Sequence, residues 1–135
     1  MFIIFRLRAR SNNLRNEISK KEKIYFRDCG VRNAVINAYE DMDIRQDIGQ
    51  LRENFCIIES IKYLYYSGHF VQHYFWRNYQ GQEVDYMYTE NSKIFAFECK
   101  WNSKKKVKVP PQFQLLYPHA TFDIIHPQNY DTLFR

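Results

Sequence analysis

The sequence predicts a mixed α/β domain, and three observations support this fold class. Apolar residues keep helical spacing from Ile48 to about Tyr66, and Gly68 follows where such a helix would end. After Gly68 the hydrophobic period changes to two, which is typical of half-buried strands. With 135 residues, 45% hydrophobic and 26% charged, the chain has the size and composition of one globular domain.

The expected elements follow one another along the chain. The apolar run at 24–26 predicts a buried strand, and a short helix is expected over 31–38. Asp47, with Gln50 three residues later, forms a capping-box arrangement in front of the long helix. Pro110-Pro111 is suited to open a short helix through Tyr117, before the last strand. Four strands are expected in this second half, at 70–77, 82–89, 94–101 and 121–126.

Basic residues are concentrated at the start of the chain and in one later stretch. Residues 1–32 hold nine basic and three acidic side chains, so we expect a basic lead segment over 1–23 and a domain over 24–135. The later stretch contains Lys100, Lys104, Lys105, Lys106 and Lys108. Such clusters neutralise phosphates, which makes DNA an expected partner with the lysines at 104–106 and 108 as contacts. A solvated basic loop explains the same lysine run.

Several classes of protein are excluded or disfavoured. No apolar run approaches the roughly 20 residues that a membrane helix needs, so no membrane partner is expected. Arg6 directly follows the apolar start, which argues against a signal peptide. Three scattered cysteines without a CxxC motif fit reduced thiols in the cytoplasm. No GxxxxGK[ST] motif occurs, so we do not expect this chain to be a P-loop ATPase.

Two acidic residues are expected to meet on neighbouring strands. Pairing of 82–89 with 94–101 around a four-residue turn gives the pairs Thr89–Ile94, Met87–Ala96, Asp85–Glu98 and Glu83–Lys100 on one side of the sheet. The other side then carries Val84, Tyr86, Phe95 and Phe97. Carboxylates directly opposite each other are destabilising unless a cation bridges them or one is protonated. The sequence therefore allows a divalent-cation site, or a solvated polar face with a Glu83–Lys100 pair.

Glu83-Val84-Asp85 followed by Glu98-Cys99-Lys100 resembles the D…(D/E)xK signature of the PD-(D/E)XK nuclease superfamily, with valine in place of the usual proline. The resemblance implies a restriction-endonuclease-like core, in which helices flank a central mixed sheet. It implies that Asp85 and Glu98 bind Mg²⁺ or Mn²⁺. Lys100 matches the lysine that orients the attacking water, and Glu53 matches a third acid on the preceding helix.

An ordered set of segments narrows the resemblance. The set consists of residues 13–18, 23–33, 51–55, 76–77 and 83–85. Together they resemble the uncharacterised C-terminal domain that follows the AAA+ module in many bacterial and archaeal ATPases. This resemblance implies a nuclease-like DNA-binding domain, with Mg²⁺-dependent deoxyribonuclease activity as its enzymatic form. The alternative is a non-catalytic DNA-binding or regulatory module that serves an ATPase partner.

Overall fold

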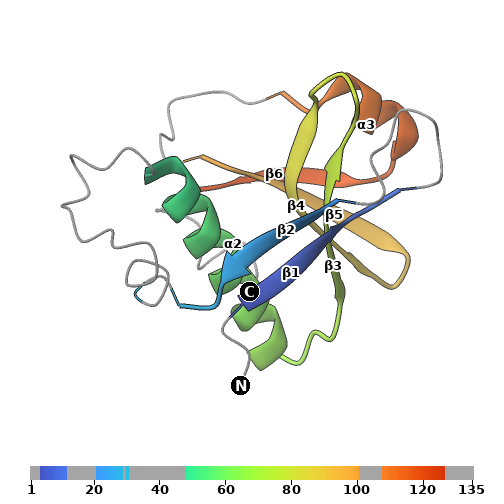
Figure 1. Ribbon diagram of the computed structural model, residues 1–135. Coiled ribbons are helices and arrows are strands. Elements are labelled where there is room, and N and C mark those ends of the chain that lie inside the picture. The colour runs from blue at the N-terminus through green and yellow to red at the C-terminus, as the bar shows by residue number, and fades with distance from the viewer. Residues whose placement is uncertain (1–3, 12–20, 29, 31–47, 101–107, 127–135) are drawn as a thin grey trace.

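The computed structural model describes residues 4–11, 21–28, 30, 48–100 and 108–126 (Figure 1). Its strands are β1 (Ile4–Ala9), β2 (Glu22–Phe26), β3 (Gln72–Arg77), β4 (Glu83–Glu90), β5 (Lys93–Cys99) and β6 (Thr121–Ile125). Its helices are α2 (Ile48–Tyr66) and α3 (Pro111–Leu116). The strands form one sheet in the order β2-β1-β3-β4-β5-β6. The mixed α/β class is therefore confirmed.

The sheet combines antiparallel and parallel pairs. β3, β4 and β5 are consecutive antiparallel neighbours, as the period-two pattern after Gly68 predicts. β1 pairs with β2 antiparallel and with β3 parallel, and β6 pairs with β5 parallel. Parallel neighbours need a crossover connection, and α3 lies in the segment that joins β5 to β6.

Within the described residues, one helix covers each face of the sheet, as the resemblance implies. Ala96 and Phe97 are adjacent on β5 and therefore point to opposite faces. Phe97 packs in a cluster with Ile57, Ile61 and other residues of α2, which defines the α2 side. Ala96 packs with Phe113 of α3, which defines the α3 side. Both clusters are built almost entirely from aliphatic and aromatic side chains, so burial of apolar surface is the main stabilising contribution in each.

A β-bulge interrupts β4 where it faces β3. Tyr74 is opposite Met87 and Trp76 is opposite Val84, so two residues of β4, Asp85 and Tyr86, lie across from one residue of β3. The extra residue breaks the alternation of side chains along β4. Val84 and Met87 consequently both pack on the α3 side, although they are three positions apart.

The expected assignment of faces is therefore only partly right. The pairs Thr89–Ile94 and Met87–Ala96 are observed in the expected register. The assignment of Val84 to the same side as Tyr86 is wrong, because Val84 is in the α3-side cluster and Tyr86 is in the α2-side cluster. The bulge between these two residues is the physical reason.

Residues near the N-terminus take part in the sheet. The sequence suggested a lead segment over 1–23, whereas residues 4–9 form β1 between β2 and β3, and Leu7 is fully buried. The helix expected over 31–38 and the capping residue Asp47 lie outside the described residues, and so do the lysines at 104–106. None of the helices in the described part of the chain combines the length and the apolar character needed to cross a bilayer.

Candidate metal centre

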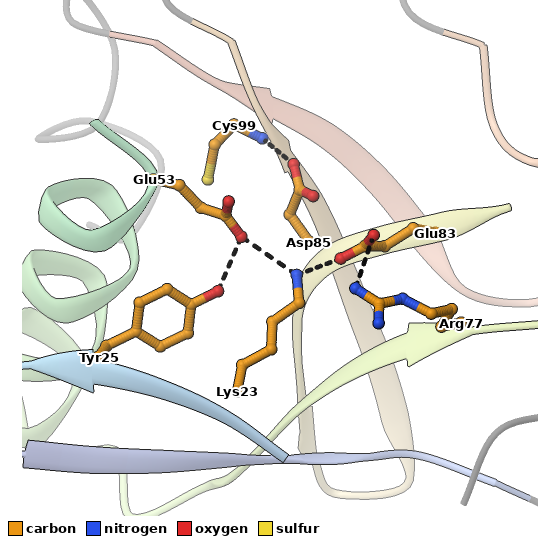
Figure 2. A network of polar contacts seen from close by, with 7 residues as sticks. All are labelled: Lys23, Tyr25, Glu53, Arg77, Glu83, Asp85 and Cys99. Carbon is orange, nitrogen blue, oxygen red and sulfur yellow. Dashed lines mark hydrogen bonds and ion pairs between the residues drawn. The ribbon is translucent and has the colours of Figure 1, made fainter. Parts of the chain in front are cut away.

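Three carboxylates from two elements gather on the α2 side of the sheet. Glu53 comes from the first turns of α2, and Glu83 and Asp85 come from the start of β4. One carboxylate oxygen from each lies within 4.8 Å of the others, and each residue is half-buried. Figure 2 shows these side chains converging on one point, together with Lys23 and Tyr25 from β2.

Local structure explains why each acid reaches this point. Glu53 precedes the buried residues Cys56 and Ile57 by three and four positions, so it lies on the face of α2 that packs on the sheet. Glu83 lies on the side opposite Val84 by ordinary strand alternation. The bulge then keeps Asp85 on the same side as Tyr86, so that its carboxylate lies near Glu53 on the α2 side of the sheet.

Two basic side chains compensate two of these three acids. The Lys23 ammonium donates to Glu53 Oε1 at 3.1 Å and also to Glu83 Oε1. Arg77, which is directly opposite Glu83 on β3, donates to Glu83 Oε2 at 3.1 Å. The Tyr25 hydroxyl donates to Glu53 Oε1 at 2.7 Å. These contacts tie β2, α2, β3 and β4 together through polar groups.

Asp85 differs from the other two acids because it accepts a hydrogen bond from a backbone group. Its Oδ2 accepts a hydrogen bond of 2.9 Å from the backbone N–H of Cys99, across the gap between β4 and β5. Burial raises the pKa of Asp85, and the carboxylate of Glu53 raises it further, to about 7. The Cys99 N–H and Lys23 act in the opposite direction without cancelling this effect. Asp85 therefore exchanges a proton near neutral pH.

The pKa values of Glu83 and Lys23 are shifted in the directions expected for an ion pair. Burial alone would raise the pKa of Glu83, but Lys23 and Arg77 together hold it below its ordinary value. Burial alone would lower the pKa of Lys23, but Glu53 and Glu83 together raise it. Both groups are thus charged at neutral pH.

Glu98 and Lys100 form a separate pair at the end of β5. Their charged atoms are 3.1 Å apart, so they share one side of the strand as expected. Phe97 and Cys99 both contact the α2-side cluster, so alternation turns Glu98 toward the opposite side from Asp85. Glu98 is still near enough for its carboxylate to contribute to the raised pKa of Asp85. The expected direct Asp85–Glu98 pairing is not observed, because the bulge moves Asp85 out of that register.

The prediction that Glu83 pairs with Lys100 is also wrong. Glu83 pairs with Lys23 and Arg77, whereas Lys100 pairs with Glu98. Among the lysines expected to contact DNA, Lys108 lies within the described residues and is exposed. The structure thus brings Glu53 and Asp85 together and leaves Glu98 and Lys100 on the adjoining strand end.

Four members of the network were not predicted as site residues: Glu83, Arg77, Lys23 and Tyr25. Lys23 and Tyr25 lie on β2 with Ile24 between them, so alternation places them on one side of the sheet. Ile24 is largely exposed whereas Tyr25 is buried, which confirms that the two sides differ. The sequence holds this signal, but nothing local relates Lys23 to Glu53, which is 30 residues away.

The fold and the site define a mixed α/β domain with a half-buried acidic cluster at the start of β4. A family model described as "Domain of unknown function (DUF4143)" matches residues 48–132, from α2 through β6, and the chain belongs to this family. No curated protein and no solved structure shows significant similarity to the chain. This match agrees with the resemblance only in that the family is one of uncharacterised domains.

Proposed function

We propose that this protein is a nuclease-like domain that binds DNA and hydrolyses phosphodiester bonds with Mg²⁺ or Mn²⁺. The observation that carries the proposal is the cluster of Glu53, Glu83 and Asp85, whose oxygens lie within 4.8 Å of one another. Carboxylate oxygens are the hard ligands that these ions prefer, so the donor set fits the ion. When bound, such an ion supplies an activated water and stabilises charge on a phosphate.

The residues of this chain have separate roles in the proposal. Glu53 and Asp85 would hold the ion, and Glu83 would complete the acidic cluster. The pKa of Asp85, raised to about 7 by burial and by Glu53, is that of a carboxylate that lacks sufficient positive charge nearby. Glu98 would add negative charge from the neighbouring strand. The resemblance assigns the water-orienting role to Lys100, whose partly exposed side chain would have to leave Glu98 and turn past the end of β5 to act there.

DNA is proposed as the substrate because of the lysines that follow β5. Lys100 lies at the start of this stretch and the exposed Lys108 at its end. When such residues neutralise phosphates, counterions are released from the DNA. Association should therefore weaken steeply as the salt concentration rises. An affinity that is undetectable at low salt, or independent of salt, would contradict this part of the proposal.

The activity is tested with single-stranded, duplex and branched DNA in the presence of each metal. Asp85→Asn should abolish both metal binding and cleavage, and Lys100→Ala should abolish cleavage while sparing metal binding. Glu59→Gln is the matched control, because Glu59 is an acid of the same helix that pairs with Lys62 instead. Cleavage that persists in Asp85→Asn would show that this site is not responsible.

A non-catalytic DNA-binding or regulatory module, serving an ATPase module or partner, is the second candidate. The observation that favours it is the charge balance of the cluster, in which Lys23 and Arg77 pair with Glu53 and Glu83. Glu53 and Glu83 are therefore compensated without a metal ion. Metal binding without cleavage of any of the three DNA forms would favour this candidate.

A further inference from the structure

Lys23 has an unusual position for a lysine on an edge strand. β2 lies at one edge of the sheet, yet the Lys23 side chain extends inward over the ring of Phe75, whose centroid is 5.1 Å from the ammonium. Only 18% of the side chain is exposed. Phe75 itself is fully buried in the α2-side cluster. Lys23 therefore has an apolar surface under its stem and carboxylates around its charge (Figure 2).

The ammonium lies between two of the three acids that would bind a metal. It contacts one oxygen of Glu53 and one of Glu83, which belong to different elements. Without this cation the two half-buried carboxylates would repel each other, because the second basic residue, Arg77, contacts Glu83 and not Glu53. A divalent ion placed among the same oxygens would provide the same compensation with twice the charge.

We propose that Lys23 is a tethered counter-cation that holds Glu53 and Glu83 together in the metal-free protein and competes with the divalent ion for them. The inference rests on the proposed metal centre and adds a mode of regulation to it. Metal binding then requires the ammonium to leave the two carboxylates. The protein therefore binds the metal ion more weakly than the same three acids would without the Lys23 ammonium.

The first test compares Lys23→Met with a matched control, Lys62→Met. Lys62 is a lysine that pairs with an acid of α2, Glu59, at 3.3 Å, outside the acidic cluster. Calorimetric titration with Mn²⁺ should give a Kd about tenfold lower for Lys23→Met than for the wild type, and no change for Lys62→Met. Without metal, the urea midpoint of Lys23→Met should fall, and saturating Mn²⁺ should restore it.

The second test uses the wild-type chain and therefore does not depend on how the variant folds. Amine-reactive labelling followed by mass spectrometry measures the accessibility of each lysine. Mg²⁺ should increase the labelling rate of Lys23 severalfold, because its ammonium is displaced, and should leave Lys62 unchanged.

The outcomes separate the two proposals. Equal Mn²⁺ affinity in the wild type and Lys23→Met, or metal binding without a change in the labelling of Lys23, would overturn the inference and leave the metal centre standing. Weaker binding in Lys23→Met would also overturn it. Absence of Mn²⁺ binding in both proteins would overturn the inference together with the metal centre. Binding that appears only in Lys23→Met would support the inference in its strongest form.

Discussion

The two ends of the β4–β5 pair are built on different principles. At the hairpin end, Glu90 is opposite Lys93, and the two turn residues Asn91 and Ser92 have φ values of 52° and 65°. These positive values are those of a tight type I′ turn, which fits the twist of antiparallel strands. At the other end β4 bulges at Asp85, and the Asp85 carboxylate, rather than a backbone carbonyl, accepts the N–H of Cys99.

The end of the pair that carries Asp85, the open end, differs from the hairpin end in the regularity of its ladder and in its buried charge. The hairpin end keeps a regular ladder with apolar residues on both faces. The open end loses ladder regularity and buries charged groups, which costs stability unless each charge is compensated. In exchange, acids from α2 and β4 share one small volume. Bulges and buried charge of this kind are over-represented at functional sites.

The largest expected effect comes from removing the packing next to the bulge. Trp76 is fully buried opposite Val84, and its ring lies 5.3 Å from that of Phe113 on α3. Trp76→Ala should lower the free energy of unfolding by about 3–5 kcal/mol, because it leaves a large cavity. Urea denaturation measures this loss. A loss below about 1 kcal/mol would mean that α3 packing does not support the bulged strand.

An intermediate effect, with the opposite sign, is expected from Asp85→Asn. The pKa of Asp85 is about 7 in the folded protein, above the ordinary value of 3.8, so the folded state retains the proton over this range. Stability contributed by the protonated form is therefore present below pH 3.8 and is lost as the pH rises toward 7. Asparagine carries no charge and can still accept from Cys99 N–H, so the variant should be more stable by about 2 kcal/mol at pH 8.

The matching control for this prediction is pH itself. Near pH 4 the side chain at position 85 is neutral in both folded proteins, so Asp85→Asn and the wild type should unfold at nearly the same urea concentration. The measurement is a pair of urea titrations at the two pH values. If Asp85→Asn were equally destabilised at both pH values, Asp85 would stabilise the fold through packing, and its negative charge would not be destabilising.

The smallest effect is expected at the hairpin. Ser92 has a positive φ, which glycine adopts without strain. Ser92→Gly should raise the free energy of unfolding by about 0.5–1 kcal/mol without altering metal binding. Thermal denaturation detects the gain. A decrease in stability would contradict the assignment of this turn.

The regular parts of the fold were accessible from local patterns. The helix expected from Ile48 to Tyr66 is observed with these bounds, since one face of its sequence is continuously apolar. The strands after Gly68 were found because side-chain alternation and turn residues agree. β1 also carries such a signal, since Phe5, Leu7 and Ala9 alternate with arginines. Its charge was interpreted as a basic lead, although alternation of this kind is typical of a strand covered on one face.

The site depends on contacts that no local pattern contains. The position of Asp85 follows from a bulge whose flanking residues, Val84 and Tyr86, are fixed by packing against opposite faces. One extra residue in a strand moves every side chain beyond it to the other side of the sheet. Regular alternation therefore predicted that Glu83 and Asp85 share the side of Met87, whereas they lie on the opposite side. Lys23 and Tyr25 reach Glu53 only because the sheet brings β2 close to α2.

The most direct test of the carboxylate cluster is calorimetric titration of Mn²⁺ into the wild type, Glu53→Gln and Glu98→Gln. Glu53 belongs to the group of acids within 4.8 Å of one another, whereas Glu98 pairs with Lys100. If the acids gathered by the bulge bind the ion, Glu53→Gln should weaken Mn²⁺ binding by at least about tenfold, and Glu98→Gln should weaken it less. Binding that is abolished by Glu98→Gln and unchanged by Glu53→Gln would show that the ion is bound elsewhere.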